Sequence, residues 1–179
     1  MVELRIRNQG LTGQLPPELG DLTNLRVLGL DRNQLSGRIP PELGNLSNLV
    51  ELDLQSNSLT GRIPPELGNL SLLGVLDIGG NGFIGEIPLE IGNLTNLQAL
   101  SFFDNALEGE IPSELGNLTN LRDLLFAYNR LSGEVPTELG NLTLLNRLLL
   151  SETRLTGTLP GELAETADLD IEGSGITVG

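Results

Sequence analysis

Residues 35–58 read LSGRIPPELGNLSNLVELDLQSNS, and most of the remaining chain repeats this line with small changes. Its apolar residues are Leu35, Ile39, Leu43, Leu46, Leu49, Leu52 and Leu54. The wider spacings could line one face of a helix, but Pro40, Pro41 and Gly44 interrupt that face. The alternation that ends at Leu54 is typical of a strand with one buried face. One such unit cannot bury its leucines alone, whereas a stack of copies can.

The copies are in phase over the whole chain, at a period of 24 residues. A proline column consists of Pro16, Pro40, Pro64, Pro88, Pro112, Pro136 and Pro160. A glycine column consists of Gly13, Gly37, Gly61, Gly85, Gly109, Gly133 and Gly157. An asparagine column consists of Asn33, Asn57, Asn81, Asn105 and Asn129. A fixed period of this length predicts a solenoid.

Each column has a physical interpretation. An inward-facing amide can bond backbone groups of the adjacent turn, so we interpret the asparagine column as structural. We interpret the glycine column as a place where the backbones of neighbouring turns pass closely.

We expect one domain over residues 1–179, formed by a partial first turn at 1–10, six full turns at 11–154 and a closing turn at 155–179. Eight parallel strands should centre on residues 4–6, 28–30, 52–54, 76–78, 100–102, 124–126, 148–150 and 169–171. The closing turn is atypical, because residues 164–167 replace the Gly-Asn-Leu-Thr sequence and the segment before Leu169 is shorter. Terminal repeats commonly differ in this way.

The composition excludes several classes of partner. The net charge is −14 and there is no lysine, which argues against nucleic acid or an anionic membrane as a partner. No stretch is long and apolar enough to insert into a membrane. The chain has no cysteine and therefore no disulfide. We interpret the recurring glutamates of the P-x-E-L turns as a solvated outer face.

The sequence offers little for catalysis. Without histidine or cysteine, the usual nucleophile–base pairs are missing, and we expect no enzyme activity and no cofactor. Glu51, Asp53 and Asp77 could form a glycosidase pair or hold calcium. An open sheet does not desolvate such acids, so we favour a solvated sheet face and expect no metal site.

Residues 49–70 fit the pattern L-x-x-L-x-L-x-x-N-x-L-x-G-x-I-P-x-x-L-G-N-L, which resembles the plant-type extracellular leucine-rich repeats. The resemblance implies an α/β repeat fold, a leucine-rich-repeat solenoid with a parallel β-sheet on the concave face. Short second strands and 3-10 or irregular segments should form the convex side. It also implies an extracellular or cell-surface location. Family members include receptor ectodomains and inhibitors of pectin-degrading enzymes, which bind partners on the concave face, and a few related proteins bind ice.

Five N-x-S/T sequons lie at Asn45, Asn69, Asn93, Asn117 and Asn141. They are possible N-glycosylation sites in a secreted protein. The alternative is that the consensus G-N-L-T/S arises from turn chemistry alone.

The outward positions of the strands carry the strongest functional signal. The early turns are charged, whereas the later ones bring apolar residues together. We predict a ligand-binding patch on the concave face that comprises Phe103, Asp123, Leu125, Ala127, Tyr128, Arg147 and Leu149. Aromatic residues often anchor partners, with charged residues at the rim.

The sequence therefore favours a non-catalytic recognition module that binds a protein or peptide on its concave sheet, a second copy of the chain included. One alternative is a structural or designed consensus scaffold without a natural ligand. Another is a carbohydrate-binding or ice-binding protein, which would use the convex Thr and Ser positions, but Ile84 and Glu108 interrupt that column.

Overall fold

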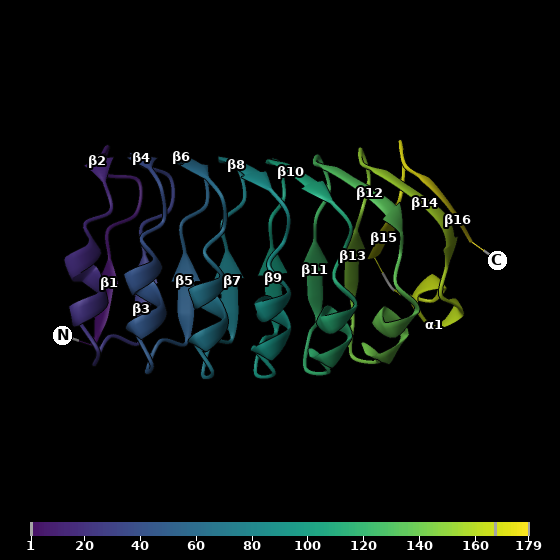
Figure 1. Ribbon diagram of the computed structural model, residues 1–179, viewed down its shortest axis with the longest axis horizontal. Helices are drawn as coiled ribbons and strands as arrows, with labels where there is room; N and C mark the ends of the chain where they lie inside the picture. Colours follow the sequence, from purple (N-terminus) through teal and green to yellow (C-terminus); the bar gives the residue numbers. More distant parts are fainter. Residues whose placement is uncertain (1, 167, 179) are drawn as a thin grey trace.

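Two parallel β-sheets run along the whole chain, and every turn contributes one strand to each (Figure 1). The computed structural model describes residues 2–166 and 168–178. The first sheet contains β1 (Glu3–Arg5), β3 (Val27–Gly29), β5 (Glu51–Asp53), β7 (Val75–Asp77), β9 (Ala99–Ser101), β11 (Asp123–Leu125), β13 (Arg147–Leu149) and β15 (Asp168–Asp170). The second contains β2 (Thr12–Gln14), β4 (Gln34–Gly37), β6 (Ser58–Gly61), β8 (Gly82–Gly85), β10 (Ala106–Gly109), β12 (Arg130–Glu134), β14 (Arg154–Leu159) and β16 (Gly175–Val178).

Short helices close the turns on the side away from the first sheet. Six are 3-10 helices: η1 (Pro17–Asp21), η2 (Pro41–Asn45), η3 (Pro65–Asn69), η4 (Leu89–Asn93), η5 (Ser113–Asn117) and η6 (Thr137–Asn141). A proline precedes each of them in extended backbone, as at Pro40 with φ −66° and ψ 134°. In the closing turn an α-helical segment, α1 (Gly161–Ala164), takes this place. No helix among the described residues is long and apolar enough to cross a membrane.

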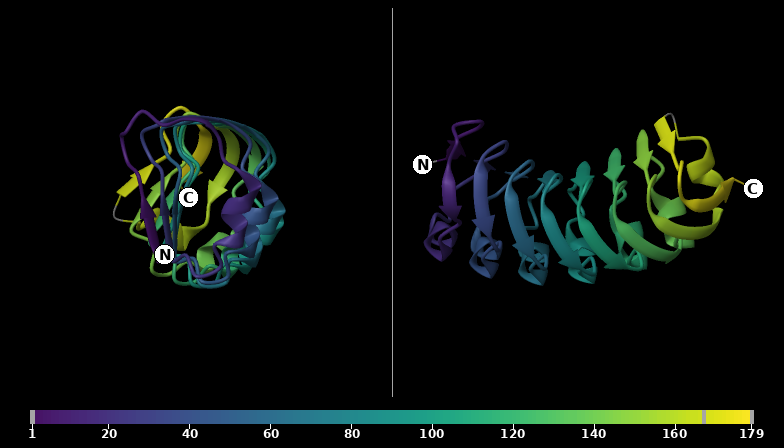
Figure 2. Two further views of the ribbon diagram at one scale, coloured as in Figure 1. Left: turned by 90° about the vertical axis from the view of Figure 1, so that its left-hand side faces the viewer. Right: turned by 90° about the horizontal axis from the view of Figure 1, so that it is seen from above.

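The predicted fold class and the strand ladder are confirmed. Leu76, Leu100 and Leu124 pair in register on β7, β9 and β11, and each is fully buried. The strands begin one residue earlier than predicted. Figure 2 shows the turns stacked along one gently curved axis. The interior is a continuous leucine column, in which Phe102 and Phe126 stack with ring centroids 5.3 Å apart.

The asparagine column ties each turn to the one before it. Asn81 donates from Nδ2 to the carbonyl oxygen of Leu54 in the preceding turn, at 3.1 Å. The same amide donates to Ile78 and Gly79 of its own turn. Its Oδ1 accepts the backbone N–H of Leu59 at 3.0 Å. The equivalent bonds to the preceding turn are made by Asn33, Asn57, Asn105 and Asn129.

Toward the C-terminus, hydroxyl groups take over from the amides. Thr153 and Ser174 stand in the asparagine column, and their hydroxyls donate to Leu150 and Ile171 of their own turns. The ladder of side-chain amide bonds between turns therefore ends at Asn129.

Two glycine columns have different roles. Gly61 has φ 88°, in the left-handed region that favours glycine, so backbone conformation explains the first column. The close passage that we expected there lies instead at the glycines of the first five 3-10 helices. A Cβ atom on Gly44 would lie only 2.4 Å from the carbonyl oxygen of Glu66 in the next turn.

A second, exposed amide ladder runs beside the 3-10 helices. Asn48, Asn96 and Asn120 donate to Thr23, Ser71 and Thr95 respectively, at 2.8–2.9 Å. We did not predict this ladder, since leucines interrupt its column at positions 72 and 144.

The two ladders provide a matched test of the structural role of the buried amides. Asn81→Ala leaves the buried Leu59 N–H without a partner and removes one of two donors from the carbonyl oxygens of Leu54, Ile78 and Gly79, so we expect a loss of about 1–3 kcal/mol of stability in urea unfolding. Asn96→Ala removes one exposed bond and should cost less than about 1 kcal/mol. Equal losses for the two variants would contradict the role assigned to Asn81.

Candidate functional site

The outward side chains of the first sheet divide into two regions. The strands alternate, so that the middle leucine of each points into the core and its neighbours point out. We call Phe103, Leu125, Tyr128 and Leu149 the aromatic patch, and Arg5, Arg7, Asp31, Glu51, Asp53 and Asp77 the charged half. The charged half occupies β1 to β7 with their following loops, and the aromatic patch occupies the turns of β9, β11 and β13.

The aromatic patch is built around one aromatic pair. The rings of Phe103 and Tyr128 meet edge to face, with centroids 5.2 Å apart and an interplanar angle of 66°. The two side chains remain 37% and 51% exposed. Leu125 and Leu149 are half-buried and pair in register on β11 and β13. The four side chains therefore come from three consecutive turns onto one surface.

Ala127 does not contribute a surface, contrary to our expectation. It is 1% exposed and lies outside the main hydrophobic cluster. A methyl group is too short to reach past the larger side chains of a sheet surface, whereas an aromatic ring extends well beyond it. The accessible patch therefore lacks Ala127, which we had predicted to belong to it.

Tyr128 stands in a backbone position that aromatic residues rarely take. Its φ is 57°, and the equivalent residue of every turn also has positive φ, at Asn8, Arg32, Ser56, Gly80, Asp104 and Glu152. Glycine, asparagine and aspartate tolerate this region better than a bulky residue does. The ring is therefore held at the loop beside the sheet at some cost in backbone energy.

The rim residues Asp123 and Arg147 form an ion pair across β11 and β13. Arg147 Nε lies 2.7 Å from Asp123 Oδ1, and this hydrogen bond raises the pKa of Arg147. The pair borders the two leucines of the patch, since both strands continue from it in register.

Two arginines organise the charged half. Arg5 makes a two-pronged contact with Glu51, at 2.7 and 2.8 Å. Arg7 Nε lies 2.8 Å from Asp31 Oδ1, and Arg7 Nη2 lies 3.2 Å from Asp53 Oδ2. The contacts with Glu51 and Asp53 skip a strand, from β1 to β5, whereas Asp31 lies in the neighbouring turn. We did not predict these pairs, although opposite charges signalled them: Asp31 shares the column of Arg7, and Glu51 and Asp53 lie one column away from Arg5 and Arg7.

The carboxyl group of Asp53 is buried beside other acids. Only 7% of the residue is exposed, and burial raises the pKa of Asp53 from 3.8 to about 6. The charges of Asp31 and Asp77 raise it further, while the N–H of Gln55 and the Arg7 guanidinium lower it. Burial also raises the pKa of Asp77. The sheet thus desolvates two acids that we had expected to be solvated.

These acids do not assemble into a metal site. Across residues 2–166 and 168–178, no group of three or more acidic side chains has a spacing that could hold a metal ion.

The remaining predicted positions lie away from the concave face. Asn45, Asn69, Asn93, Asn117 and Asn141 are all exposed at the ends of the 3-10 helices. On the second sheet, Ser36, Thr60 and Thr156 donate their hydroxyls to glycine carbonyls of the preceding turn, at 3.3 Å. Those hydroxyls are therefore occupied as donors within the protein.

The pKa of Asp53 leads to a prediction about pH. In the folded chain Asp53 stays protonated up to about pH 6, whereas in the unfolded chain it ionises near its usual 3.8. Its contribution to stability is therefore present at low pH and lost as the pH rises through about 6. Asp53→Asn should flatten this decline and raise stability at pH 7 by more than about 1 kcal/mol.

The matched control is Asp21→Asn. It removes the same charge at an exposed position of η1, where the next turns carry asparagine. We expect this variant to show the same decline in stability between pH 4 and pH 7 as the parent in thermal unfolding. If Asp53→Asn were less stable than the parent at pH 7, the ion pair with Arg7 would outweigh the cost of burial.

Comparison with known proteins agrees with this architecture. Residues 4–132 match the sequence model of a leucine-rich repeat region, while no curated protein matches significantly. A TDR receptor structure is 43% identical, with a TM-score of 0.88 over 92% of this chain and 29% of the receptor chain. The Arabidopsis receptor kinase HAESA, solved with the peptide hormone IDA and the co-receptor SERK1, is 37% identical, with a TM-score of 0.94 over 100% of this chain and 30% of that chain.

A plant ice-binding protein is also similar. It is 35% identical, with a TM-score of 0.87 over 97% of this chain and 57% of the other. The chain spans less than a third of the two receptor chains. The family-model match covers well over half of the chain, and its turns have the plant-type length of 24 residues. The chain therefore belongs to the leucine-rich repeat family.

Proposed function

We propose that this chain is a non-catalytic recognition module that binds a protein or peptide segment on its concave first sheet. The observation that carries the proposal is the exposed edge-to-face pair of Phe103 and Tyr128, in a chain with only four phenylalanines and one tyrosine. Two of the other phenylalanines, Phe102 and Phe126, stack on each other inside the core. Exposed aromatic clusters commonly anchor partners.

The position of Tyr128 in its turn supports the same conclusion. Every turn has a residue with positive φ at this place, among them Arg32, Ser56 and Glu152, so the backbone there belongs to the repeat. The departure from the other turns is the aromatic side chain, which this bend presents beside Phe103.

The charged half defines the chemistry of the partner. Two arginines there face a larger number of carboxylates, and the chain as a whole carries a net charge of −14. A partner that places an apolar side chain on the aromatic patch and basic residues toward β5 and β7 would match both regions. The structure of HAESA with a peptide hormone is consistent with an extracellular peptide-binding role.

An ice-binding or carbohydrate-binding role has less support. The hydroxyls of Ser36, Thr60 and Thr156 already donate to backbone carbonyls. Ile84 and Glu108 interrupt their column. A flat array of free hydroxyls is therefore missing from this part of the second sheet.

Replacing both aromatic residues tests the proposal. Peptides selected from a display library on the immobilised wild-type chain would be measured by calorimetry against Phe103→Ser with Tyr128→Ser. Loss of two anchor residues should weaken binding by at least about 2 kcal/mol, which is roughly 30-fold.

The control is Leu72→Ser with Leu144→Ser, which removes two side chains that are 48% and 45% exposed outside the concave face. This variant should bind as the wild type does. Selected peptides that bind the aromatic variant normally, or that lose affinity only for the control, would refute the concave site. Sedimentation of the aromatic variant would also show whether a second copy is the occupant.

A further inference from the structure

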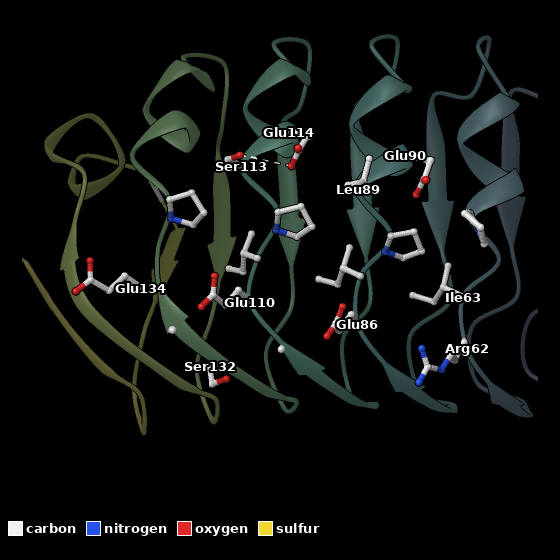
Figure 3. A pocket seen from close by; sticks show the side chains of 18 of the residues that line it. Arg62, Ile63, Glu86, Leu89, Glu90, Glu110, Ser113, Glu114, Ser132 and Glu134 are labelled. Atoms are coloured by element: carbon white, nitrogen blue, oxygen red, sulfur yellow. Dashed lines mark hydrogen bonds between the residues drawn. The ribbon is translucent and has the colours of Figure 1, made fainter.

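A second surface with binding character lies on the flank of the solenoid, between the second sheet and the 3-10 helices (Figure 3). Two adjoining hollows of about 1350 and 380 Å3 share Arg62 and Pro64 in their walls. Prolines 64, 88, 112 and 136 line the larger hollow, together with buried isoleucines. We call this surface the flank groove.

A stripe of long charged side chains follows the groove. It occupies the position after the repeating glycine, and its members are Arg38, Arg62, Glu86, Glu110 and Glu134. Figure 3 shows the last four following one another across neighbouring turns. All five are exposed, and none takes part in an ion pair within the described part of the chain. The stripe therefore changes sign once, between Arg62 and Glu86.

Two exposed apolar residues lie where the sign changes. Ile84 on β8 replaces the Ser or Thr found in most turns and is 50% exposed. Leu89 begins η4, where other turns have Pro, Ser, Thr or Gly, and is 55% exposed. Ile84 contributes to the smaller hollow and Leu89 to the larger one. Both departures from the repeat occur in the turn that also carries Glu86.

We propose that the flank groove pairs with the flank groove of a second copy of this chain, through a twofold axis perpendicular to the solenoid. An axis between the turns of Arg62 and Glu86 places Arg62 of each copy opposite Glu86 of the other. The same axis places Arg38 opposite Glu110. Because a twofold interface is self-complementary, a stripe that reverses its sign about its centre is what such pairing requires.

The apolar residues fit the same arrangement. Neighbouring turns are about 4.8 Å apart, so Ile84 and Leu89 lie within a few ångströms of the axis. Rotation brings the sheet side of one groove onto the sheet side of the other, and the helix side onto the helix side. Ile84 of one copy then meets Ile84 of the other on the sheet side of the interface. Leu89 of one copy meets Leu89 of the other on the helix side. The long Arg and Glu side chains fill the hollow between these two contacts.

The size of the surface sets the expected strength. The groove spans five turns, about 20 Å along the solenoid at 4.8 Å per turn, which is short for a patch of the roughly 800 Å2 per partner that a standard stable interface buries, so we expect a reversible, concentration-dependent dimer. The net charge of −14 repels the two copies at long range. Salt near 0.15 M limits that repulsion to about 8 Å, while the paired charges in contact are screened less.

Charge exchange tests the pairing. Sedimentation velocity of the full 179-residue chain at 0.15 M salt should show dimers that increase with concentration. Arg62→Glu creates like-charge contacts twice in the symmetric interface, so the dimer should weaken by more than about tenfold. Arg62→Glu with Glu86→Arg exchanges the two charges and should restore the dimer. Ile84→Ser with Leu89→Ser should abolish it.

Arg122→Glu is the matched control, because it makes the same charge change at an exposed residue outside both hollows. It should leave the dimer unchanged, and circular dichroism would verify that every variant folds. A chain that stays monomeric at millimolar concentration would overturn the proposal. Failure of the exchanged variant to recover would do the same, as would a dimer lost only in Phe103→Ser with Tyr128→Ser.

Discussion

The buried asparagine ladder is the constraint on which the rest of the fold depends. Each turn must leave the first sheet through a tight bend, where backbone N–H and C=O groups face the interior and have no strand partner. Asn81 bonds four backbone groups there, and two of them, the N–H of Leu59 and the carbonyl of Leu54, lie one layer back in the stack. An unpaired buried polar group costs about 1–3 kcal/mol, so each amide fixes both the shape of its turn and the position of its neighbour. Leucine supplies the burial that drives folding, but it packs in many ways; the amide selects one.

Identical turns have a consequence for function. When the backbone repeats, residues of the same position form columns, and the surface is determined by where a column departs from its consensus. Phe103 and Tyr128 are such departures on the concave face, and Ile84 and Leu89 are such departures on the flank. Their apolar surface adds nothing to the core, which is complete without them. A scaffold maintained only for stability would have little reason to place them there.

Period and phase were enough to predict the two sheets, because one turn fixes the geometry of all the others. The site was predicted less completely. Ala127 belongs to an outward position but is buried, since exposure depends on the size of neighbouring side chains and not on strand alternation alone. Arg7 contacts Asp31 directly across to the next turn but reaches Asp53 diagonally, and a long flexible side chain can choose among several acids. The repeating glycines illustrate the same limit. The backbone angle φ shows which glycines form a left-handed bend and which allow a close backbone approach, whereas the sequence does not distinguish the two.

The distribution of arginine distinguishes the two faces. Arg5, Arg7 and Arg147 are bound to carboxylates on the concave sheet, so that this face is already organised before any partner arrives. Arg38 and Arg62 have no ion-pair partner within the described residues, although acids follow them in the same stripe. Side chains that are already held in place lose less entropy on binding. Such a face suits a partner that is recognised specifically. A stripe of free charges that changes sign once instead favours a surface that aligns two large bodies. The residues that line the flank groove are distinct from those of the concave sheet, so a partner on one face leaves the residues of the other free to bind.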